Sequence, residues 1–120
     1  MADSVGVSLL GAGNVGAAVL SALIKDTERN NQLVGTKLEL RYVLVRDIKK
    51  HDKKFKDVNF TKNFNDVLND EHTSIIVELM GGQVPAKEYI ASLLKKGKHV
   101  VTANKDVMAQ SGSELTDLAV

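Results

Sequence analysis

The sequence contains no cysteine, no tryptophan and a single proline in 120 residues. The lack of cysteine excludes disulfide bonds and thiolate metal sites, and it is consistent with a reducing cytosol. Aromatic residues make up only 4% of the chain. A hydrophobic core must therefore be built mainly from Val, Leu, Ile and Ala, which suits parallel strands covered by helices.

The sequence also has little excess charge, with a formal net charge of +1. This balance argues against nucleic acid or an anionic membrane as a partner. No segment approaches the roughly 20 consecutive apolar residues that a membrane span requires. The first residues carry Asp3 and no basic residue, unlike a secretory signal peptide. We therefore expect a cytoplasmic protein with no nucleic-acid or membrane partner and, since the three histidines are scattered, no metal site.

Short β-rich runs alternate with helical stretches along the whole chain. This alternation predicts βαβ units and an α/β, Rossmann-type, doubly wound parallel sheet in three layers, with residues 1–120 as one domain. The expected strand order is 3-2-1-4-5. Strands are predicted at residues 5–10, 38–45, 58–61, 74–79 and 99–102, and a loop around Asn30, Asn31 and Gly35 precedes the second.

Helices are predicted at residues 15–25, 64–69, 85–96 and 105–110, with a last helix after residue 111. Asn63 is a plausible N-cap, and Gly97 lies where a left-handed C-cap belongs. Ser111 and Glu114 have the spacing of a capping box. The last helix reaches Val120 without a stop signal, so we expect a chain cut before a second domain.

A glycine-rich turn follows the first predicted strand, formed by Gly11, Ala12, Gly13, Asn14, Val15 and Gly16. In a G-x-G-x-x-G turn between strand and helix, the first glycine permits the tight turn and the second leaves room for a pyrophosphate. The third allows close packing, and the helix N-terminus offers free N–H groups. This context favours dinucleotide binding over a purely structural turn or a ligand such as S-adenosylmethionine.

The end of the second strand, at Arg46 and Asp47, bears on the choice between NAD and NADP. An acidic residue there holds the ribose hydroxyls, whereas an arginine accommodates a 2′-phosphate. Arg46 comes first and favours NADP, although use of both cofactors stays open. The lysines that follow, at residues 49–54, are more simply explained as a solvated surface.

Two further segments follow the fourth and fifth strands. Glu78 is unusual in an apolar run and is followed by Gly81 and Gly82; an ion pair or a place near the nicotinamide would explain it equally well. Lys105 would begin a helix, where the dipole and partial burial both disfavour its charged form. Such a lysine can assist proton transfer to a carbonyl oxygen, or orient the cofactor or the substrate.

Four segments in this order and spacing, LLGAGNVG, VLVRD, VELMGG and GKHVVTANKDVMA, resemble the N-terminal domain of homoserine dehydrogenase. The resemblance covers nearly the whole chain. It implies NADP or NAD as cofactor and the interconversion of aspartate 4-semialdehyde and homoserine, which leads to threonine, methionine and isoleucine. It also implies a homo-oligomeric full-length enzyme whose second domain supplies most substrate contacts, so the 120 residues alone should bind cofactor weakly and catalyse little.

The resemblance further implies a role for each candidate site residue. The glycine turn and Arg46 would hold the adenosine and pyrophosphate. The residues at the nicotinamide end would be Gly81, Gly82, Thr102, Asn104 and Lys105, with Lys105 the catalytic candidate. Two alternatives stay open: a non-catalytic NAD(P)-sensing module, and another small amino-aldehyde or imine reductase with the same N-terminal fold.

Overall fold

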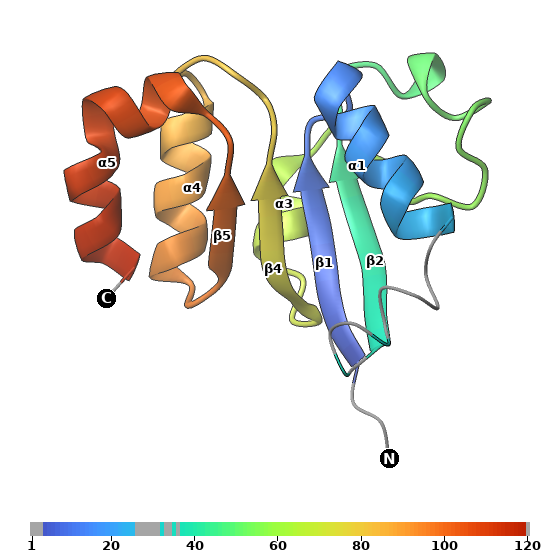
Figure 1. Cartoon of the computed structure of the whole chain (residues 1–120), viewed down its shortest axis with the longest axis horizontal. Helices are drawn as coiled ribbons and strands as arrows, with labels where there is room; N and C mark the ends of the chain where they lie inside the picture. Colours follow the sequence, from blue (N-terminus) through green and yellow to red (C-terminus); the bar gives the residue numbers. More distant parts are fainter. Residues whose placement is uncertain (1–3, 26–31, 33–34, 36, 120) are drawn as a thin grey trace.

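The computed structural model describes residues 4–25, 32, 35 and 37–119 and contains a five-stranded parallel sheet (Figure 1). The strand order is β3-β2-β1-β4-β5, so the predicted class and order are confirmed. The strands are β1 (Ser4–Leu10), β2 (Lys37–Leu44), β3 (Phe60–Thr61), β4 (Thr73–Glu78) and β5 (His99–Thr102). Of the loop predicted before β2, Asn30 and Asn31 lie outside the described residues.

Helices lie on both faces of this sheet. They are α1 (Asn14–Lys25), α3 (Phe64–Leu68), α4 (Ala86–Lys95) and α5 (Lys105–Ala119), with a short 3-10 helix η1 (Ile48–Lys50). Successive side chains of β1 point to opposite faces of the sheet. Leu9 packs with Leu20 of α1 on one face, whereas Leu10 packs with Val67 of α3 and Leu93 of α4 on the other. The three layers follow from this alternation. No helix within the described ranges is long and apolar enough to cross a membrane.

The C-terminal part of the chain differs from the prediction. A break before Ser111 and a capping box with Glu114 were expected, but α5 runs through both residues without interruption. Ser111 is buried between Val107 and Leu115, at the helical spacing of four residues, on the buried face of α5. Glu114 instead pairs with Lys87 of α4, with 3.1 Å between Nζ and Oε2. The small serine side chain therefore continues the packed face of one helix.

Residues 48–57 are rich in lysine and aspartate, yet one residue of this segment is buried. Phe55 is 9% exposed and belongs to the core cluster that includes Val43 and Val45 of the β2 region. Lys53 and Lys54 beside it are exposed, as predicted. The phenylalanine thus anchors the charged segment to the sheet.

Arg41 and Asp70 form an ion pair beside the amino end of β4. The guanidinium Nε and Nη2 donate to the two carboxylate oxygens over 2.9 and 3.1 Å. This hydrogen-bonded pair holds the pKa of Asp70 well below its ordinary value. Lys98, just before β5, donates from Nζ to the carbonyl oxygens of Asp70 and Thr73, at 2.7 Å each, and burial lowers its pKa. These contacts join β2, β4 and β5 away from the glycine turn.

Candidate functional site

The glycine turn lies at the carboxyl edge of the sheet, between β1 and α1 (Figure 1). Gly11 has φ +99°, and a Cβ there would lie 3.3 Å from the carbonyl group of Leu79. A Cβ at Gly16 would lie 2.6 Å from the carbonyl oxygen of Gly11. A Cβ at Gly13 would meet nothing within 4 Å. The first and third glycines therefore permit close backbone packing, whereas the second faces open space.

Helix α1 begins directly at this open space. Its first residue is Asn14, and Ala17 donates from its backbone N–H to the carbonyl oxygen of Gly13 over 2.7 Å. The first N–H groups of a helix have no partner within the helix and carry the positive end of its dipole. The start of α1 is therefore suited to an anionic group placed over Gly13.

A cavity of about 640 Å³ opens beside the turn, and we name it the Arg46 cavity. Its walls come from the glycine turn, the segments after β2, β3 and β4, and the start of α4; they include Gly11, Ala12, Gly13, Arg46, Asp47, Lys50, Lys62, Leu79 and Tyr89. Arg46, Lys50 and Lys62 form no ion pair within the described part of the chain. Asp47 caps η1, where its Oδ1 accepts from the backbone N–H of Lys49 over 3.0 Å. The cavity thus has three cationic side chains available to an anion.

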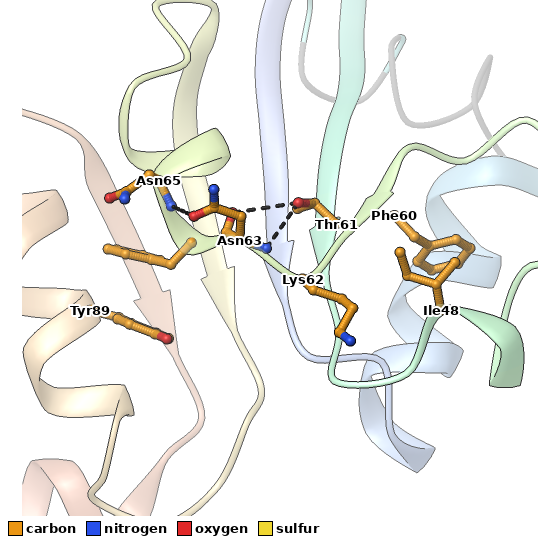
Figure 2. A pocket seen from close by; sticks show the side chains of 8 residues that line it. Ile48, Phe60, Thr61, Lys62, Asn63, Asn65 and Tyr89 are labelled. Carbon is orange, nitrogen blue, oxygen red and sulfur yellow. Dashed lines mark hydrogen bonds between the residues drawn. The ribbon is translucent and has the colours of Figure 1, made fainter.

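Lys62 was not singled out from the sequence. Figure 2 shows it in a neighbouring cavity of about 620 Å³, extending between Tyr89 on one side and Ile48 and Phe60 on the other. Tyr89 stacks on Phe64 with ring centroids 3.9 Å apart and planes 8° apart, and Lys62 and Tyr89 line both cavities. The available signal was topological: Lys62 directly follows β3, whose carboxyl end lies beside that of β2.

A third cavity, of about 400 Å³, lies on the other side of Leu79, and we name it the Lys105 cavity. Its walls include Val15, Leu79, Gly81, Ala103, Asn104, Lys105 and Asp106. Lys105 is the first residue of α5, where it was expected, but its side chain is exposed. The expectation of partial burial for Lys105 is not met in this structure: Asn104 before it and Val107 after it are buried, but the Lys105 side chain faces away from the core.

Glu78 lies fully buried at the end of β4 and takes part in no ion pair within the described residues. The backbone N–H of Met80 donates to Oε2 over 2.7 Å, and the Thr102 hydroxyl donates to Oε1 over 2.5 Å. Asn104 donates from Nδ2 to Glu78 Oε2 over 3.4 Å and to the carbonyl oxygen of Gly82 over 2.6 Å. Of the two explanations left open, the ion pair is not found; hydrogen bonds satisfy this carboxylate.

The fold brings the predicted site residues into two groups. The Arg46 cavity contains the first half of the glycine turn and Arg46; the Lys105 cavity contains Val15, Gly81, Asn104 and Lys105. Gly16 packs against the backbone of Gly11 and lines neither cavity. Gly82 accepts a hydrogen bond from Asn104, which lines the Lys105 cavity, and Thr102 donates to Glu78, which also accepts from Asn104. Leu79 lines both cavities. A ligand with two ends can therefore extend from one to the other across the glycine turn.

Comparison with known proteins gives a consistent result. Residues 11–120 match the family described as homoserine dehydrogenase, NAD binding domain. A homoserine dehydrogenase of Lactococcus lactis is 37% identical over 119 residues, 97% of this chain and 28% of that protein; one of Bacillus subtilis is 37% identical over 110 residues, 91% of this chain and 25% of that protein. The crystal structure of a homoserine dehydrogenase from Thiobacillus denitrificans superposes with a TM-score of 0.91 at 35% identity, over 98% of this chain and 27% of that one. The chain thus spans about a quarter of the length of these relatives.

Proposed function

Because this chain belongs to the homoserine dehydrogenase family, as its NAD-binding domain, we propose that it holds NADPH or NADH for the interconversion of aspartate 4-semialdehyde and homoserine. The family match favours this enzyme over a sensing module or a different reductase. The chain would contribute the cofactor-holding part of the reaction. Residues outside these 120 would contribute most substrate contacts, and the whole enzyme would act in the cytoplasm as a homo-oligomer.

The observation that carries the proposal is that the glycine turn lines both cavities, the Arg46 cavity through Gly11 to Gly13 and the Lys105 cavity through Val15. The Arg46 and Lys105 cavities share Leu79 as a wall, and Gly13 leaves open space beside the start of α1. A dinucleotide has two ring systems joined by a pyrophosphate, so it needs two cavities with an anion site between them. The residues present fit such a cofactor.

Each cavity would then have a distinct task. Arg46 and Lys62 would bind the phosphate of the adenosine ribose, which favours NADPH over NADH. The paired glycines Gly81 and Gly82, with φ +77° and +70°, would let the backbone approach the nicotinamide. When bound, the cofactor supplies or accepts the hydride.

Lys105 would act at the nicotinamide end of the cofactor. Its ammonium group, at the start of α5, would orient the substrate or exchange a proton with its carbonyl oxygen. Within a full-length enzyme, Lys105→Ala should lower kcat far more than it weakens cofactor binding. Lys53→Ala, an exposed lysine that lines neither cavity, is the control.

The first experiment is a calorimetric titration of the purified chain with NADPH and, separately, with NADH. Saturable binding with a preference for NADPH supports the proposal. If neither cofactor binds to the chain or to a polypeptide with the length of the relatives, the proposal is wrong. Steady homoserine-dependent reduction of NADP by the 120 residues alone would contradict the proposal that residues outside this chain contribute most substrate contacts.

A further inference from the structure

Glu78 is surrounded by hydrogen-bond donors. The backbone N–H of Met80, the Thr102 hydroxyl and the Asn104 side-chain amide all donate to its carboxylate, which is 0% exposed. The two oxygens of Glu78 are the acceptors in all three hydrogen bonds, so each neighbour uses its donor on Glu78. Glu78 therefore sets the direction of the hydrogen bonds around it.

The hydrogen bond to Glu78 first determines what the Thr102 hydroxyl can accept. Because the hydroxyl proton of Thr102 points to Glu78, its oxygen accepts from the backbone N–H of Asn104, over 3.0 Å. This contact holds the residue that immediately precedes α5. The Thr102 hydroxyl thus connects the end of β5 to the start of α5.

The hydrogen bond to Glu78 also determines how the side-chain amide of Asn104 is oriented. Its NH2 group faces Glu78 and the carbonyl oxygen of Gly82, which leaves its oxygen to accept from the backbone N–H of Val107 over 3.1 Å. An oxygen that accepts from the third residue of a helix is an N-cap. The same amide thus caps α5 and holds the Gly82 carbonyl.

We propose that Glu78 is a positioning residue for the nicotinamide end of the cofactor site, an inference that rests on the proposed function. Through Thr102 and Asn104 it fixes the start of α5, with Lys105, relative to the Gly81–Gly82 segment. These two segments contribute to the wall of the Lys105 cavity. Glu78 itself does not line that cavity, so it acts through its neighbours.

The test uses Glu78→Gln, which keeps the shape of the side chain and introduces a donor. If the new NH2 takes the Oε2 position, it faces two other donors; if it takes the Oε1 position, Thr102 can no longer donate there. Asp70→Asn is the matched control, because Asp70 is a largely buried carboxylate that precedes β4, the strand that Glu78 ends, and it also accepts several hydrogen bonds.

Calorimetry on the chain would compare two ligands, NADPH and 2′-phospho-ADP-ribose, which lacks the nicotinamide ring. Glu78→Gln should weaken NADPH about tenfold and change the affinity for the fragment by less than about twofold. Asp70→Asn should change both affinities by the same factor. Equal weakening of both ligands by Glu78→Gln, or no weakening of NADPH, would overturn the proposal, since a purely structural role affects both ligands alike.

A second readout does not depend on the cofactor. Amide hydrogen exchange of Asn104 and Val107, measured by NMR, should become faster in Glu78→Gln and stay unchanged in Asp70→Asn. If the unchanged chain binds neither ligand, the two affinities are compared in a polypeptide with the length of the relatives, where absence of binding would make the proposed function fail. The exchange result decides on Glu78 in either case. Unchanged exchange at both amides would overturn its positioning role.

Discussion

Gly16 packs against Gly11 so closely that a Cβ on Gly16 would lie 2.6 Å from the carbonyl oxygen of Gly11. The contact is with backbone, which cannot rotate away, so Gly16→Ala must displace α1 or the turn. We expect a loss of about 1–3 kcal/mol in the free energy of unfolding, despite the better helix propensity of alanine. Urea denaturation measures this change.

Gly112 offers the control for that substitution. It lies within α5, and a Cβ there would first meet the end of the flexible Met108 side chain, at 3.3 Å. Gly112→Ala should therefore stabilise the protein by up to about 1 kcal/mol. If both substitutions change the free energy of unfolding equally, helix propensity, and not the contact with Gly11, accounts for the effect of Gly16→Ala.

Gly13→Ala tests the open space beside Gly13 in the Arg46 cavity. A Cβ at Gly13 would meet nothing within 4 Å, so we expect a melting temperature close to that of the unchanged chain. The added methyl group would occupy the space proposed for the pyrophosphate and weaken NADPH at least about tenfold. Undiminished binding, measured by calorimetry, would place the pyrophosphate elsewhere.

Arg46→Ala and Lys62→Ala test the cofactor preference. Both side chains line the Arg46 cavity and form no ion pair within the described residues. Each substitution should weaken NADPH about tenfold and NADH much less, because only NADPH has a 2′-phosphate for a charge-assisted hydrogen bond. Lys53→Ala should change neither affinity. A similar loss for both cofactors would show that these side chains bind a part that NADPH and NADH share.

Asp70→Asn should change how stability depends on pH. Arg41 holds the pKa of Asp70 below its ordinary value of 3.8, so the ionised form stabilises the fold at pH values above about 4. That contribution is lost as the pH falls below 3.8 towards the lower pKa of the folded state. The variant should therefore be less stable at pH 6, by about 1–3 kcal/mol, and lose less stability on acidification to pH 2.5.

Urea denaturation at a series of pH values measures the effect of Asp70→Asn. Asp52→Asn, at an exposed carboxylate, is the control and should run parallel to the unchanged chain. If the Asp70→Asn curve is also parallel, the ion pair with Arg41 does not account for the acid sensitivity of the fold.

Much of the fold could be predicted because its signals are local. Gly97 has φ +83° at the end of α4, and Asn63 accepts from the backbone N–H of Asn65 at the start of α3. A glycine with positive φ and an asparagine cap act within a few residues, so the sequence alone marks them. The same locality explains the error at Ser111, whose spacing suits a cap as well as a helix interior.

Other features depend on which segments meet in space. Phe55 belongs to the core although its neighbours in the sequence are charged, because the fold places it against β2. Lys62 and Tyr89, 27 positions apart, line the same cavities because β3 and the start of α4 converge at the carboxyl edge. No periodicity in the sequence records that convergence.

The sequence by itself determined the alternation of strands and helices, the place of the glycine turn and the family. These follow from backbone preferences and from motifs that span few residues. Only the tertiary structure decided that Glu78 is held by hydrogen bonds instead of an ion pair, and that its partners come from β5 and the start of α5. The physical reason is that burial and the direction of hydrogen bonds are properties of groups distant in sequence, and packing brings them together.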